Sequence, residues 1–307
     1  MSKIFGRRAN NEIDKVHAQA WFCVISARMW HASAYAIEKY YKTNQDDFSG
    51  DFIYTKQFKH YEKGRYLPRH EIVEWFENRE DINFKGTQKI FDNLFWLLLK
   101  ESRISPNKLY GLLEELPIPV AAAVQSPNDA RRFFSELSSF DGLAGCQFLL
   151  CEASNNLIRD ADSILFNFLV MLQIISRLGA YRDYRSIALP LFNLIRNQCL
   201  EFLRPYVNET RETIQLIENL EIEKMIRYRV IILRIIDEMS IFNKLRLAPP
   251  SCLYLAEKYI TTTILNELSP MIRNNDISKI KSHSSIQKLK RSLRRWEKIA
   301  LRRNLVH

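Results

Sequence analysis

The residues best suited by type and spacing to bind a ligand are the cations between Asp51 and His70. This block sets two acids, Asp51 and Glu62, against five basic residues: Lys56, Lys59, Lys63, Arg65 and Arg69. Lysine and arginine neutralise phosphates and release counterions, whereas amide and guanidinium groups hydrogen-bond to base edges in the major groove. The block therefore predicts contact with a polyanion, and a solvated helix face is the alternative interpretation.

A second group of cations lies near the end of the sequence. Residues 279–303 hold ten Lys/Arg and one acid, Glu297, and so carry nearly all of the net charge of +10. Apolar residues at helical spacing predict one amphipathic helix with the stripe Ile286, Leu289, Leu293, Trp296 and Ala300. We expect an anionic partner to contact Lys288, Arg291, Arg294, Arg295 and Lys298. Nucleic acid, an anionic membrane surface and an acidic protein all fit this pattern, and a docked helix with a solvated basic face is the alternative.

No pattern typical of catalysis or of a bound metal competes with these cations. The six histidines have no metal-ligand spacing with one another or with cysteine, and the sequence holds no glycine-rich phosphate loop and no nucleophile elbow. Cys146 and Cys151 are expected to pack in a helix core. The spacing of Arg65 and His70 resembles the Arg-x4-His pair of HEPN-type ribonucleases, but Pro68 breaks the helix that both residues need. We therefore expect no enzymatic activity, no cofactor and no metal.

The elements that position these residues are expected to be helices throughout. Hydrophobic residues make up 47% of 307 residues, only eight are glycine, and apolar spacings are mostly three and four. Ser105-Pro106 and Ser126-Pro127 mark helix starts, Pro190 is expected to kink a helix, and Pro205 to end it. Helices are expected at 11–41, where a turn near 31–33 could split the segment, at 52–63, 69–78, from Thr87 onward, and at 131–137, 143–153, 161–178, 182–204, 206–220 and 221–244.

The sequence divides into three expected regions. The first is a helical domain at 1–116, which ends before the proline-containing segment 117–126. A larger helical, bundle-like domain follows at 127–275, and a basic tail helix occupies 276–307.

Between the helices expected at 52–63 and 69–78, Gly64 and Pro68 form a stop signal. Glycine suits the left-handed position after a helix C-terminus, and proline suits the start of the next helix. We therefore expect a positive φ at Gly64. The simplest interpretation is an ordinary helix end followed by a proline-started helix.

The same block resembles the latter part of a Cro/repressor-type helix-turn-helix. The resemblance rests on Tyr61, Glu62, Lys63, Gly64 and Pro68, which match the turn that follows the recognition helix in that family. It implies that Ile53 and Phe58 are core residues and that Arg65 and Arg69 lie near phosphates. The residues implied to lie at the major groove are Thr55, Lys56, Gln57, Lys59 and His60. The compact turn of that family is replaced here by the polar segment 44–50.

A wider span, about 21–99, is similar to a group of uncharacterised proteobacterial proteins. The shared residues are Trp21, the segment 33–39 (SAYAIEK), the Tyr61/Gly64/Pro68 block, Gly86-Thr87 and Phe95-Trp96. This resemblance implies a DNA-binding-like region and no assigned activity.

Five cysteines without a CxxC pair, and a start that lacks an apolar leader, favour free thiols in a cytoplasmic protein. The most apolar stretch, 163–175, is too short and too polar to span a bilayer. We expect a nucleic-acid-binding protein, with DNA favoured and a regulatory role. The alternative is a helical interaction or scaffold protein, with a protein partner or a second copy of the chain, whose tail binds RNA, DNA or an acidic partner.

Overall fold

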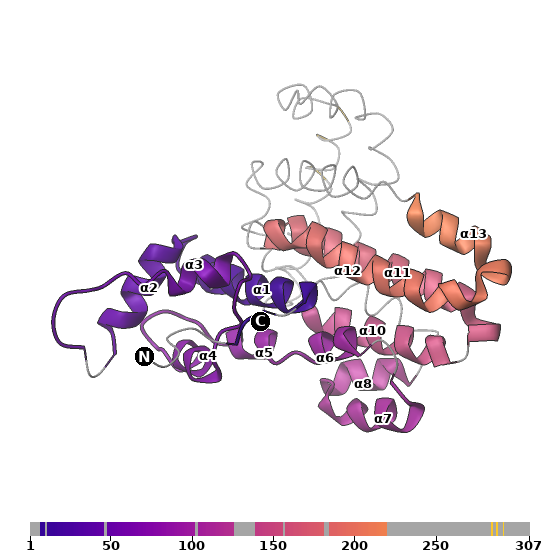
Figure 1. Cartoon of the computed structure of the whole chain (residues 1–307), viewed down its shortest axis with the longest axis horizontal. Helices are drawn as coiled ribbons and strands as arrows, with labels where there is room; N and C mark the ends of the chain where they lie inside the picture. Colours follow the sequence, from indigo (N-terminus) through magenta and orange to yellow (C-terminus); the bar gives the residue numbers. More distant parts are fainter. Residues whose placement is uncertain are drawn as a thin grey trace. The chain divides into compact units, whose positions relative to one another are not determined.

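The computed structural model describes residues 7–9, 11–45, 48–101, 104–125, 139–155, 157–180 and 184–219, together with Ser284, Gln287 and Arg291. Every element in these ranges is a helix, and the extended feature among them is an isolated antiparallel bridge between Arg8 and Tyr66. The all-α prediction is thus confirmed for this part of the chain. The chain forms two compact units, Met1–Leu220 and Glu221–His307, and the helices described below belong to the first (Figure 1).

The first helices of this unit surround an aromatic core. They are α1 (Glu12–Arg28), α2 (Ala34–Thr43), α3 (Gln57–Glu62), α4 (His70–Glu77) and α5 (Thr87–Phe91). Helix α1 contacts α3 and α5, while α2 contacts α3 and α4 contacts α5. Trp21 of α1 is fully buried, and its ring lies 5.8 Å from those of Tyr61 and Phe76 in edge-to-face geometry. Such aromatic pairs add specific geometry to the burial of apolar area, so this core fixes α3 and α4 against α1.

The other described helices of the unit pack mainly on α10 (Phe140–Asn155) and α11 (Leu157–Ala180). They are α6 (Leu94–Lys100), α7 (Pro106–Gly111), η1 (Leu112–Glu115), α8 (Ile118–Val124), α12 (Arg185–Leu203), η3 (Arg204–Tyr206) and α13 (Val207–Glu218). Helix α10 contacts α6, α8 and α11, while α12 contacts α11 and α1. The domain boundary expected at 117–126 therefore falls inside one compact unit, because apolar residues of α8 pack on α10 instead of forming a linker.

Two expected helices are divided in the structure. The segment 11–41 breaks after Arg28, where Trp30 and His31 take positive φ angles of 57° and 62° and Ser33 caps α2. The helix expected from Thr87 onward ends at Phe91, and Asn93 starts α6 by accepting a hydrogen bond from the Phe95 amide. Side-chain caps such as these compete locally with helix continuation, which apolar periodicity alone does not reveal.

The proline predictions are confirmed at two helix ends, and the kink expected at Pro190 stays a prediction. Pro106 begins α7, and α12 ends at Leu203, two residues before Pro205. Helix α12 continues through Pro190 as one element. The helices expected at 131–137 and 221–244, and the start at Ser126-Pro127, lie outside the described residues.

Two carboxylates each cap the helix that follows their own in sequence. Glu77 of α4 accepts hydrogen bonds from the amides of Gly86 (2.7 Å) and Gln88 (2.9 Å) and from the Thr87 hydroxyl (3.1 Å) at the start of α5. Burial raises the pKa of Glu77, but these hydrogen bonds outweigh it and hold the pKa below its usual value. Glu38 of α2 likewise accepts hydrogen bonds at the start of α3, as described below.

Candidate nucleic-acid interface

The turn after α3 is held tightly against α1. Gly64 has a φ of +63°, as expected from the sequence, and its amide donates to the Tyr61 carbonyl at 2.9 Å. The Arg65 amide donates to the His60 carbonyl at 2.8 Å, which satisfies the end of the helix. A Cβ at position 64 would lie 2.6 Å from the carbonyl oxygen of Lys15. Only glycine fits there, so the exit from α3 is fixed relative to α1.

An N-terminal segment pairs with the chain that leaves this turn. The Ala9 amide donates to the Arg65 carbonyl at 3.0 Å, and the Leu67 amide donates to the Arg7 carbonyl at 2.8 Å. Arg8 therefore lies opposite Tyr66, and its side chain is exposed. In an antiparallel pair, residues directly opposite one another project to the same face. The pairing therefore places Arg8 beside Tyr66, which adds a cation that the sequence interpretation did not include.

Three cations lie near the imidazole of His60. Burial lowers its pKa, and the positive charges of Arg65, Lys63 and Lys56 lower it further. Its ring packs edge-to-face on Tyr66, with 5.3 Å between the ring centroids. We call the exposed residues Arg8, Lys56, Lys63 and Arg65 the basic cluster.

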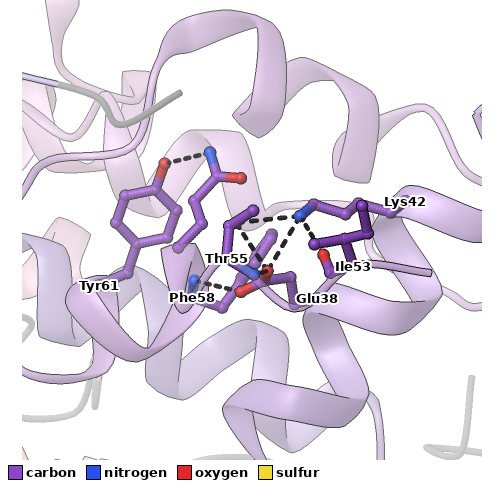
Figure 2. Close-up of polar contacts among 7 residues, drawn as sticks. Glu38, Lys42, Ile53, Thr55, Phe58 and Tyr61 are labelled. Carbon is purple, nitrogen blue, oxygen red and sulfur yellow. Dashed lines mark hydrogen bonds and ion pairs between the residues drawn. The ribbon is translucent and has the colours of Figure 1, made fainter. Parts of the chain in front are cut away.

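Glu38 positions the start of α3 and with it Lys56 (Figure 2). Its side chain is fully buried and accepts hydrogen bonds from the Thr55 amide (2.6 Å), the Thr55 hydroxyl (2.8 Å) and the Phe58 amide (3.3 Å). Lys42 donates to Glu38 at 3.1 Å and to the Ile53 carbonyl at 2.8 Å. These bonds satisfy backbone groups at the helix N-terminus and hold Lys56, with a φ of +64°, at the surface.

The structure supports exposure for only some of the residues expected to contact DNA. Lys56 and Arg65 are exposed, whereas His60 and Arg69 are half-buried. Lys59 forms an ion pair of 2.6 Å with Glu62, so its charge is largely balanced. The Thr55 hydroxyl donates a hydrogen bond to Glu38 and accepts one from Lys42 at 3.0 Å.

Two expectations in this segment are wrong. Gln57 is only 4% exposed, and its amide donates to the Tyr61 hydroxyl at 3.0 Å, so it does not reach outward to a base. Ile53, expected in the core with Phe58, is 73% exposed, while Phe58 is fully buried as expected. The reason is that α3 begins only at Gln57, so Ile53 lies in the non-helical chain that precedes it, with its side chain exposed.

A compact helix-turn-helix is not formed by these elements. Residues 44–56 separate α2 from α3, and α3 is six residues long.

In the described part of the tail, Arg291 is helical and exposed. The other tail cations expected to bind a partner lie outside the described residues: Lys288, Arg294, Arg295 and Lys298.

Among the histidines in the described ranges, His17 is buried in the core. Burial lowers the pKa of His17 to about 3, and its ring stacks 4.5 Å from that of Trp96. Arg65 precedes α4, whereas His70 is its first residue, so the two do not share a helix. Across the described ranges, no group of three His, Cys, Asp or Glu residues is arranged to hold a metal.

The chain matches no protein-family model, no curated protein and no solved structure in the comparisons. The Cro-like and proteobacterial resemblances therefore remain predictions. Among the helices that the structure describes, none has the length and apolar character needed to cross a membrane.

Proposed function

We propose that this protein binds nucleic acid through the basic cluster. The observation that carries the proposal is the placement of Lys56, Lys63 and Arg65 near His60, whose pKa is lowered by burial and by these three cations. Arg8 adds a fourth exposed cation, because it pairs with Tyr66, whose ring packs on that of His60. Phosphate groups at this surface would release counterions and supply affinity without a catalytic step.

The proposed contacts go to phosphates rather than to base edges in a major groove. The amide of Gln57 is buried, and the hydroxyl of Thr55 is occupied by Glu38 and Lys42. The side chains at or just before the start of α3 that are best suited to hydrogen-bond to bases are thus engaged within the protein, while the cations at the two ends of α3 are exposed. DNA is the first polymer to test, and a regulatory role would follow from binding rather than from chemistry.

The tail is proposed to add further phosphate contacts. Its ten Lys/Arg face a single acid within 25 residues, so most cannot pair within the segment. Reversing the charges at Arg291, Arg294, Arg295 and Lys298, with the apolar stripe intact, should weaken binding most at low salt, where screening is weakest. Unchanged low-salt affinity would restrict binding to the basic cluster.

The test of the basic cluster is a matched pair of triple variants of the full chain. Lys56→Ala/Lys63→Ala/Arg65→Ala removes three cations of the cluster, and Lys85→Ala/Arg204→Ala/Arg211→Ala removes three exposed cations elsewhere. Each lost phosphate contact lowers the slope of log K against log salt by about 0.9 on duplex DNA. The first variant should bind more weakly with a smaller slope than the control. Equal affinity and slope in the two folded variants would overturn the proposal.

Association with a protein partner or a second copy is the other candidate function. Trp30 favours it, because this large apolar side chain is 93% exposed on a turn with positive φ. Sedimentation velocity of the chain and of Trp30→Ser tests the self-association form. A concentration-dependent species that the variant lacks would support it, and monomers throughout would exclude it.

A further inference from the structure

Three aromatic side chains form a patch on the outer side of α2. Tyr35 is 49% exposed, and its ring centroid lies 5.1 Å from that of Tyr54 and 5.6 Å from that of Phe52. Phe52 and Tyr54 are half-buried, with their ring centroids 6.5 Å apart. We call these three residues the aromatic patch. Soluble proteins rarely leave three neighbouring aromatic rings partly open to water without a binding role.

The aromatic patch is rigidly supported from beneath. The chain that carries Phe52 and Tyr54 is tied to α2, because Glu38 binds both the amide and the hydroxyl of Thr55 and Lys42 binds the Ile53 carbonyl (Figure 2). Tyr35 lies on the first turn of α2 itself. The rings are therefore held in place before any ligand arrives, which lowers the entropy cost of binding.

Lysines lie beside the aromatic patch and connect it along the chain to the basic cluster, and one exposed acid, Asp51, precedes Phe52. Lys39 is exposed one helical turn after Tyr35, and Lys42 Nζ lies 5.7 Å from the centroid of the Phe52 ring. Lys56 belongs to the basic cluster and follows Tyr54 by two residues. A ligand that covers the rings and these lysines must combine flat aromatic groups with closely spaced negative charge.

We propose that the aromatic patch stacks the bases of a single-stranded nucleic acid whose phosphates contact Lys39 and the basic cluster. Single strands expose base faces, whereas a duplex keeps them stacked inside, so rings of this kind select the single-stranded form. This inference rests on the proposed function and names the form of nucleic acid that the same site takes. Because stacking reads no base edges, the buried amide of Gln57 does not hinder it.

The test uses three fluorescent probes of equal length, about 20 nucleotides each: oligothymidylate, an oligomer of abasic sites and a duplex. The full chain carries either Tyr35→Leu/Phe52→Leu/Tyr54→Leu, which keeps apolar volume but removes the rings, or the control Tyr110→Leu. Tyr110 is 52% exposed and lies away from this surface on α7. Circular dichroism confirms folding, and Tyr35→Leu alone serves if the triple variant unfolds. Oligouridylate in place of oligothymidylate distinguishes RNA from DNA.

The wild type should bind oligothymidylate at least about tenfold more tightly than the abasic oligomer, since stacking contributes strongly for each base. The leucine variant should lose that advantage and bind the abasic oligomer as the wild type does. Equal oligothymidylate affinity in the variant and the control would overturn this inference. The proposed function would still stand if removal of Lys56, Lys63 and Arg65 weakened all three probes. Absence of binding to every probe would overturn both.

Discussion

Gly64→Ala tests whether the exit from α3 must lie directly on α1. The added methyl group meets the Lys15 carbonyl oxygen at 2.6 Å and its Cα at 3.0 Å, both of which are backbone atoms of α1 that cannot rotate away. The left-handed backbone at φ +63° costs a non-glycine residue about 1–2 kcal/mol. Overpacking against the backbone adds about 1–3 kcal/mol, and the lower entropy of the unfolded alanine chain returns about 0.4–1 kcal/mol.

The net loss in the free energy of unfolding should therefore be about 1–5 kcal/mol. In a compact unit of this size, that corresponds to a fall in Tm of roughly 2–20 °C. Urea titration followed by circular dichroism measures the loss, and fluorescence anisotropy with nucleic acid shows whether the displaced Arg65 weakens binding.

Gly86→Ala is the matched control. Gly86 also has a positive φ, +88°, but a Cβ there has no neighbour within 4 Å, so only the conformational cost applies. The two variants together separate backbone strain from the clash with Lys15. If Gly64→Ala were no less stable than Gly86→Ala, the close approach to α1 would not constrain the turn, and the reasoning would be refuted.

Three further perturbations follow from buried polar groups. Glu38→Gln should lower the free energy of unfolding by about 2–4 kcal/mol, because the amide cannot accept a hydrogen bond from every donor around it. The control Glu12→Gln, at an exposed ion pair, should change the free energy of unfolding by less than about 1 kcal/mol. Equal effects of the two variants in urea titration would contradict this prediction. His17, with a folded pKa of about 3, takes up its proton first in the unfolded state, so stability should fall as pH drops from about 6.5 by up to about 1.4 kcal/mol per pH unit. Urea titrations at several pH values should show a smaller slope in His17→Gln, and an identical slope would exclude a neutral buried imidazole. In a Cys252→Ser chain, a thiol reagent should label half-buried Cys23 first, and mass spectrometry identifies the labelled site. Burial raises the pKa of the three other thiols, Cys146, Cys151 and Cys199. Labelling of any of these three in the native state before Cys23 would contradict the prediction.

Features set by local chemistry could be predicted from the sequence. The turn at Gly64, the start of α7 at Pro106 and the helical class all follow from residues that act on their immediate neighbours. The exposure of Lys56 and Arg65 follows equally well, since charged side chains rarely lose contact with water without a partner.

Features set by contacts between distant segments could not be predicted in this way. Nothing near Arg8 in the sequence indicates that it pairs with Tyr66. Gln57 has the residue type of a base-reading side chain, and only its packing beside Tyr61 turns it inward. Ile53 was expected in the core from the Cro-type resemblance, but it lies in the non-helical chain before α3, where its side chain is exposed.

The two capping carboxylates make α3 and α5 depend on the helices that precede them. Helices α3 and α5 have six and five residues, too few to be stable alone in water. Each needs a carboxylate from the preceding helix, Glu38 from α2 or Glu77 from α4, to satisfy its first amides. A synthetic peptide covering 51–70 would thus keep Lys56, Lys63 and Arg65 of the basic cluster but lose Arg8 and the arrangement of the other three. The basic cluster therefore cannot be transferred to a short peptide, and substitutions on the buried side of α2 would alter its arrangement without changing any of its cations.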